Sequence, residues 1–171
     1  MKITLPLTKE ICDKLHAGDS LQLSGVIYTA RDAAHKRLVE MIHNNEKLPF
    51  ELENACIYYV GPTPAPPHAI VGSAGPTTSM RMDAYAPLLY DLGVRATIGK
   101  GYRTQQVKDA IVRNHACYLI CIGGAGALLS QCIKKAECIA FEDLKAEAIY
   151  RYEVEDFPCI VAIDSHGNSV Y

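Results

Sequence analysis

Three times along this chain, an apolar run ends in a loop that contains glycine and begins a helix. These loops cover residues 72–78, 99–104 and 123–126. Glycine permits the tight turn that such a connection needs, and loops that follow neighbouring parallel strands gather at one edge of a sheet. The pattern therefore predicts an α/β fold in which the three loops lie close together.

The other segments complete the expected order of elements. Runs rich in β-branched and large apolar residues predict strands at residues 21–30, 55–62, 69–74, 94–99, 117–124, 137–141 and 158–164. Apolar residues at helical spacing predict helices at about 30–44, at about 78–91, from 104 onward and from 123 onward. The run at 117–124 is apolar on both alternate faces, so we expect it to be buried on both sides of the sheet.

Local signals fix several helix boundaries. Thr29 and Asp32 resemble a capping box, which favours a helix start at about residue 30. Pro87 must kink or divide the second helix, and Gly93 suits its end. Thr104 suits the N-cap of the next helix. The inner face of that helix is expected to carry Val107, Ala110 and Ile111.

Length and charge narrow the class of protein. At 171 residues the chain suits one domain, so we expect residues 1–171 to form a single unit. A formal charge of −2 offers no concentrated basic face for phosphates, which argues against a nucleic-acid partner. No apolar run approaches the roughly 18 residues of a membrane span, and the N-terminus lacks the apolar core of a signal peptide. We therefore expect a cytoplasmic protein without a membrane partner.

Cysteine usage agrees with this expectation. The chain has seven cysteines, an odd number, and no two are spaced as CxxC, so their spacing suggests neither a disulfide framework nor a zinc site. A reducing compartment fits best. Cys117 and Cys121 lie on one face of an expected strand, where buried packing is favoured over metal binding. We therefore predict no metal ligand in this chain.

The stretch GPTTSMRMD at residues 75–83 is the strongest candidate site. If a helix begins at Thr77 or Thr78, Arg81 lies about one turn further on and can face the same side as the threonine hydroxyl. Helix amides, a hydroxyl and a guanidinium then converge, and this set suits the carboxylate of a small acid. The alternative is a plain N-cap followed by a solvated arginine.

Other charged residues near predicted helix starts extend this hypothesis. Lys100 lies between two glycines, where the backbone can approach a ligand closely, with a surface lysine as the alternative. Arg31 is in the first turn of its helix, where the macrodipole disfavours a cation; it indicates an anionic partner or is a plain surface arginine. His35 follows by one turn, which leaves open an acid–base pair with Asp32 or a structural or solvated histidine.

Four motifs and their order carry a resemblance to a known family: YTARDAAHKRL, VGSAGPTTSMRMD, GKGYRT and EAIYRYEVEDFPCIVAIDSHGN. With these motifs the chain resembles the β subunit of class I, iron–sulfur fumarate hydratases, or the C-terminal domain where both parts form one chain. The similarity spans nearly all 171 residues. The β subunit of L-tartrate dehydratase shares GPTTSMRM, but MRMD followed by GKGYRT looks more like fumarase.

The resemblance implies a fold and a partner. The fold is a three-layer, swivelling β/β/α domain that closes over an α subunit. In that family three cysteines of the α subunit hold a [4Fe–4S] cluster, so this chain need not bind the cluster itself. The assembly, whether a homodimer or an α2β2 complex, stays open.

The resemblance also implies an activity and assigns roles to residues. The activity is the reversible hydration of fumarate to (S)-malate, which needs the α subunit. Arg31, Arg81 and Lys100 are expected to bind the two carboxylates of the substrate. Thr77 matches the proposed base at C3, and Thr78 is the alternative. The competing functions are L-tartrate dehydration and carboxylate binding without catalysis.

Overall fold

The sheet of this protein is closed by its longest strand. The structure is a computed structural model that describes residues 1–121 and 126–171. The described residues form a mixed α/β fold around a seven-stranded sheet with the order β1-β2-β3-β4-β5-β7-β6. The strands are β1 (Lys2–Thr4), β2 (Ser20–Thr29), β3 (Cys56–Tyr58), β4 (Ala96–Gly99), β5 (Cys117–Ile120), β6 (Ile133–Ala140) and β7 (Ile149–Ile163).

Strand β7 makes this sheet barrel-like. Strands β1 to β5 pair in parallel. β7 pairs antiparallel with β2, where Leu21 lies opposite Cys159, and with β5, where Leu119 lies opposite Val161. Because β2 and β5 both bond to β7, the ring β2-β3-β4-β5-β7 is closed, and β6 pairs with the first part of β7.

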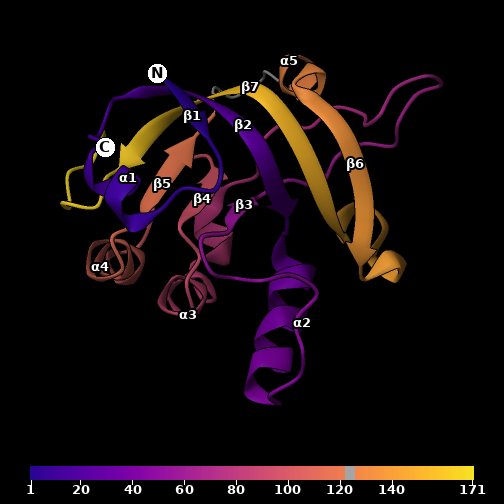
Figure 1. Cartoon of the computed structure of the whole chain (residues 1–171). Coiled ribbons are helices and arrows are strands. Elements are labelled where there is room, and N and C mark those ends of the chain that lie inside the picture. The colour runs from indigo at the N-terminus through magenta and orange to yellow at the C-terminus, as the bar shows by residue number, and fades with distance from the viewer. Residues whose placement is uncertain (122–125) are drawn as a thin grey trace.

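Helices cover one side of the closed sheet. In Figure 1, α2, α3 and α4 lie together below the strands, whereas α5 lies at the top beside the start of β6. The α-helices are α1 (Lys9–Asp13), α2 (Asp32–His43), α3 (Ala86–Asp91), α4 (Gln105–Arg113) and α5 (Gly126–Gln131). Two short 3-10 helices are η1 (Ser79–Met82) and η2 (Glu142–Glu147).

Two apolar clusters account for strands that are apolar on both faces. In β3, Cys56 and Tyr58 belong to the cluster inside the barrel, whereas Ile57 and the following Tyr59 pack with the helices. Successive side chains of a strand point to opposite faces, so these short strands are buried on both sides. Burial of apolar area is the main favourable contribution to such a fold.

Most of the predicted elements are confirmed. Strands form within or close to the predicted ranges for β2, β3, β4 and β5, and helices form at α2 and α4. Thr104 is the N-cap of α4, and the predicted inner-face residues are buried. Pro87 divides the second helix into η1 and α3, and Gly93 follows the end of α3 with a φ of 117°.

Two local predictions are wrong. Residues 69–74 form a loop instead of a strand, because Ser73 bonds with Thr63: the Ser73 N–H donates to Thr63 Oγ1 at 2.8 Å, and the Thr63 N–H donates to Ser73 O at 3.0 Å. Thr29 does not cap α2, because its hydroxyl accepts the Tyr150 N–H at 3.0 Å. The N-cap of α2 is Arg31.

The strands near the C-terminus are longer than the sequence predicts. The expected strands at 137–141 and 158–164 are the ends of β6 and β7, and the first half of β7 was not predicted. In that half Arg151, Glu153 and Glu155 alternate with buried Tyr152 and Val154, which is the pattern of a strand with one exposed face. Neither β1 nor α1 was predicted.

A buried ion pair ties together the segments that follow β3 and β4. Arg103 Nε donates to Asp83 Oδ1 at 2.7 Å, and both side chains are buried. Asp83 Oδ2 accepts the Thr104 N–H at 2.6 Å. Arg103 also donates to Thr97 Oγ1 and to the Tyr59 hydroxyl. The pair therefore fixes η1 and α3, which flank Asp83, relative to the loop after β4.

Asp83→Asn should destabilise the protein strongly, because it leaves the Arg103 charge buried without its counter-charge. We expect the free energy of unfolding to fall by about 3–5 kcal/mol in denaturant titrations at neutral pH. Asp91→Asn is the control, since Asp91 pairs with Arg113 at the surface, where such a pair contributes at most about 1 kcal/mol. Equal losses in the two variants would contradict this role of the Asp83–Arg103 pair.

Candidate functional site

The loops after β3 and β4 lie side by side. Thr78 and Lys100 form a parallel bridge. The Lys100 N–H donates to Thr77 O at 3.3 Å, and the Ser79 N–H donates to Lys100 O at 2.9 Å. Gly99 permits this approach, because a Cβ there would lie 3.2 Å from Thr77 O and would overlap the Ser79 side chain. Thr77, Thr78 and Lys100 are therefore brought together.

The start of α5 lies in the same region. The Ala74 N–H donates to Gly126 O at 3.2 Å. The predicted clustering of the glycine loops is confirmed for these residues. Residues 123–125 of the third predicted loop lie outside the described part of the chain.

The predicted helix start in GPTTSMRMD is shorter than expected. Thr78 is the N-cap of η1, which is a 3-10 helix of four residues, and no capping bond from its side chain is found among the described residues. The Thr77 N–H donates to Tyr59 O at 2.7 Å, which fixes the segment to the end of β3. The predicted contribution of a full helix N-terminus is therefore wrong, and the hydroxyls and Arg81 remain as candidate anion-binding groups.

Arg81 lies against the first turn of α2. Its Nε and Nη2 both donate to Asp32 Oδ2, at 3.1 Å and 2.8 Å. The two side chains are about half exposed, at 48% and 40%. Because Asp32 follows Arg31 directly, this ion pair brings Arg81 to the same helix end as Arg31.

The Arg31 side chain lies on Gly61. A Cβ at Gly61 would lie 2.5 Å from Arg31 Nη1 and 2.9 Å from its Cδ, so only glycine leaves room for the guanidinium in this position. Arg31 Nε is buried and has no hydrogen-bond partner among the described residues. A buried donor without a partner is costly, which fits a side chain that completes its bonds with a ligand or water.

His35 is a structural residue beneath Arg31. Its side chain is buried, and its Nδ1 lies 2.8 Å from Arg31 O. Burial lowers the pKa of His35 to about 4, so the imidazole is neutral near pH 7 and Nδ1–H donates to that carbonyl. The predicted alternative of an acid–base pair with Asp32 is wrong, because Asp32 bonds Arg81 and His35 bonds the backbone.

All five candidate residues follow the C-terminal ends of adjacent parallel strands. Arg31 comes just after β2, and Lys100 comes directly after β4. The Thr77 N–H bonds the carbonyl of Tyr59, the residue that follows β3. Carboxyl ends of parallel strands share one edge of a sheet, which is where ligands bind in open α/β proteins. The edge here carries three cationic side chains and two hydroxyls.

Comparison with known proteins identifies the family. The model of the family described as Fumarase C-terminus matches residues 1–171. The chain belongs to this family. The resemblance inferred from the four sequence motifs is thereby confirmed.

Relatives in this family carry two kinds of name. Fumarate hydratase 2 of Leishmania major is 42% identical over 156 residues, which cover 90% of this chain and 28% of that protein. The anaerobic class I fumarate hydratase of Escherichia coli strain K12 is 43% identical over 153 residues, 88% of this chain and 28% of that protein. A Methanocaldococcus jannaschii protein named "Putative L(+)-tartrate dehydratase subunit beta" is 40% identical over 171 residues, 96% of this chain and 88% of that protein. The chain thus spans about 28% of the length of these two fumarate hydratases.

Several residues that shape this fumarase C-terminus site were not singled out from the sequence. Asp83 and Arg103 were present in the quoted motifs, but nothing local indicates that they form a buried pair. Gly61 lies near the end of the strand predicted at residues 55–62, yet its role depends on Arg31, which is thirty positions away. Tyr59 contributes through its backbone carbonyl and its hydroxyl, neither of which a sequence pattern reveals.

The described cysteines do not fit an iron–sulfur cluster. No group of three His, Cys, Asp or Glu side chains that could hold a metal is found in residues 1–121 and 126–171. The Sγ atoms of Cys12 and Cys117 lie 3.8 Å apart in the apolar core. Burial raises the pKa of Cys121 to about 12, and cluster ligands are thiolates. Cys12, Cys117 and Cys121 are packing residues of the apolar core, as predicted for Cys117 and Cys121.

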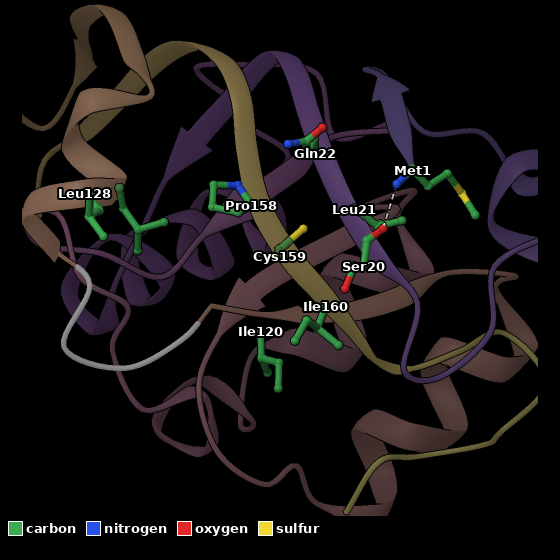
Figure 2. Close-up of a pocket in the computed structure, with 10 residues that line it drawn as sticks. Met1, Ser20, Leu21, Gln22, Ile120, Leu128, Pro158, Cys159 and Ile160 are labelled. Carbon is green, nitrogen blue, oxygen red and sulfur yellow. Dashed lines mark hydrogen bonds between the residues drawn. The ribbon is translucent and has the colours of Figure 1, made fainter.

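An apolar cavity of about 480 Å³ lies away from the candidate residues. Figure 2 shows it between β2, β7 and α5, with the Met1 amino group donating to Ser20 O. Its lining is mostly apolar and includes Leu21, Leu128 and Ile160, and it holds none of the predicted site residues. A dicarboxylate needs cationic or hydrogen-bonding partners when it leaves water, so this cavity does not suit such a ligand.

None of the helices in the described residues has the length and apolar character that crossing a membrane requires.

His35→Asn should reduce the loss of stability in acid. The folded protein resists protonation of His35 until pH falls to about 4, whereas the unfolded chain binds the proton near pH 6.5. The contribution of neutral His35 is therefore complete above pH 6.5 and is lost as pH falls towards 4, by about 3 kcal/mol in total. Asparagine retains a donor near Nδ1 and does not titrate.

The measurement is denaturant unfolding of both proteins at pH 7 and pH 4. Wild type should lose more free energy of unfolding between these values than the variant does. Because all other titrating groups are shared, the same pH dependence in both proteins would contradict the buried, neutral state of His35.

Proposed function

We propose that this chain is the β part of a class I fumarate hydratase, which reversibly adds water to fumarate to give (S)-malate. The observation that carries the proposal is the gathering of Arg31, Arg81 and Lys100 with two threonines at one edge of the sheet. Guanidinium groups bind carboxylates in a planar, two-point geometry, and an ammonium adds a point charge. The family and its relatives agree with this chemistry.

In this proposal each side chain has a separate role. Arg31 and Arg81 each bind a carboxylate group of the substrate, and Lys100 adds a third positive charge. Thr77 is half-buried and lies at the junction of the two loops, which supports it as the hydroxyl that handles the proton at C3. A threonine hydroxyl is a weak base unless its surroundings lower its pKa, so positioning of the substrate is part of its role. Thr78, which is exposed, is the alternative.

The [4Fe–4S] cluster belongs to a partner in this proposal. The described residues offer no ligand set for it, so the α part, either another chain or another domain, would hold it. Residues 1–171 would act as one swivelling β/β/α domain that covers the cluster-bearing part, in a homodimer or an α2β2 assembly. The closed sheet with its layer of helices supports this three-layer architecture. We propose a cytoplasmic setting, because seven free cysteines suit a reducing compartment.

L-tartrate dehydration is the second candidate function. It is favoured by the Methanocaldococcus relative, whose name describes a tartrate dehydratase subunit. This chain covers 88% of that protein's length. L-tartrate is also a dicarboxylate with a hydroxyl next to a carboxylate. The same cationic groups could therefore bind it.

Co-expression with an iron–sulfur α chain under anaerobic conditions tests the function. We expect hydration of fumarate by the complex and none by this chain alone, because half of the site comes from the partner. Arg81→Ala should reduce kcat/KM at least about 100-fold, since a charge-assisted bidentate contact is lost. Turnover of L-tartrate without fumarate turnover would favour the second candidate. Tight dicarboxylate binding by the isolated chain, with no activity in the complex, would favour a binding domain.

Gly61→Ala should impair the same complex without unfolding the protein. The added methyl group displaces the Arg31 guanidinium, and a 1 Å misplacement of a binding group can reduce the rate by about 100-fold. We expect kcat/KM for fumarate to fall at least about 10-fold, with the unfolding temperature within a few degrees of wild type. Gly18→Ala, where a Cβ would meet nothing within 4 Å but the φ of 96° makes alanine strained, is the control: it should cost stability and leave kcat/KM unchanged. Full activity of Gly61→Ala would contradict the proposed position of the Arg31 guanidinium.

A further inference from the structure

We propose that Asp32 is a positioning residue that determines which edge of the Arg81 guanidinium faces the substrate. The inference rests on the proposed function, because it takes Arg81 as a substrate-binding residue. It concerns a contact that lies entirely within this chain.

The geometry of the ion pair defines the edge. Arg81 donates to Asp32 Oδ2 through Nε and Nη2, which form the side edge of the planar guanidinium. Of its five N–H donors, the two on Nη1 and the second one on Nη2 remain for other partners. Nη1 and Nη2 form the end edge, which matches the two oxygens of a carboxylate. Asp32 therefore leaves Arg81 one complete two-point binding edge.

Asp32 is the more rigid member of the pair. It is the first residue of α2, a helix of twelve residues whose first turn is held by two bonds from His35 to Arg31 O. Arg81 is in η1, which has only four residues. Asp32 Oδ1 is also buried, with no hydrogen-bond partner among the described residues. The backbone of Asp32 is thus held by its helix, and the hydrogen bonds of its carboxylate among the described residues are those from Arg81.

Asp32 also sets the charge of the site. Arg31, Arg81 and Lys100 carry three positive charges and Asp32 carries one negative charge, which leaves two positive charges. A dicarboxylate carries two negative charges and neutralises this set. Asp32 therefore lowers the net charge of these four side chains from three to two, which is equal and opposite to the charge of a dicarboxylate.

The sign of the effect of Asp32 on affinity separates positioning from simple electrostatics. If Asp32 acts only by charge, its removal makes the site more positive, and the KM for a dianion should fall. If Asp32 positions Arg81, its removal frees the guanidinium from its productive orientation, and the KM should rise.

The test compares Asp32→Ala and Asp32→Asn in the complex with the α part, with fumarate as substrate. We expect KM to rise about 10-fold in Asp32→Ala and less in Asp32→Asn, because the asparagine oxygen still accepts the two Arg81 bonds. Asp32→Asn also keeps the test valid if the alanine variant fails to fold. Asp91→Asn removes the carboxylate of a similarly exposed pair with Arg113 and should leave KM unchanged. An unchanged or lower KM in both Asp32 variants would overturn the proposal.

A second measurement does not depend on activity. In NMR spectra of the isolated chain, the Arg81 Nε–H signal should be protected from exchange with water in wild type and in Asp91→Asn, and lost in Asp32→Ala. Loss in Asp32→Ala supports the proposal even if the complex is inactive with fumarate, in which case the proposed function alone fails. An equally protected signal in Asp32→Ala would show that Asp32 does not hold Arg81.

Discussion

The buried pair of Asp83 and Arg103 is the interaction on which the arrangement of the candidate site depends. Arg81 precedes Asp83 by two residues, and Lys100 precedes Arg103 by three, so both cations are attached at short range to the same pair. Charges that have left water must keep their partners and their geometry. The two segments therefore act as one rigid unit, although each is a loop or a short 3-10 helix that would be mobile alone.

Tyr59 extends this unit to the third segment of the site. Its carbonyl accepts the Thr77 N–H, its hydroxyl accepts a bond from Arg103, and its ring meets the edge of His35 at a centroid distance of 5.4 Å. His35 in turn bonds the carbonyl of Arg31. Tyr59, just after β3, thus contacts the residues that position the site: it bonds Thr77 directly and Arg103 near Lys100, and its ring packs against His35 beneath Arg31. A single buried layer below the site aligns groups that come from three separate loops.

The sequence was sufficient for features that depend on neighbours along the chain. Periodicity located β4, β5 and α4, Pro87 marked the division of a helix, and the strand–loop–helix order predicted which loops meet. It was insufficient where a partner is distant. The Thr29 hydroxyl bonds Tyr150, 121 positions away, and so cannot cap its own helix. Arg81 meets Asp32, 49 positions away, and neither residue carries a signal of the other. The candidate residues were therefore predicted, whereas their pairings required side-chain geometry.

The closure of the sheet by β7 has a consequence for how the protein is made. Within this domain β2 is synthesised well before its antiparallel neighbour β7: the Asp156 N–H bonds Ser24 Oγ, 132 residues earlier. Contacts of such long sequence separation form slowly, because the loop between them must first be ordered. Until β7 emerges, β2 and β5 each expose an edge that can pair with another chain. This domain can therefore close its sheet only after β7 has emerged, and until then the unpaired edges of β2 and β5 need protection from aggregation.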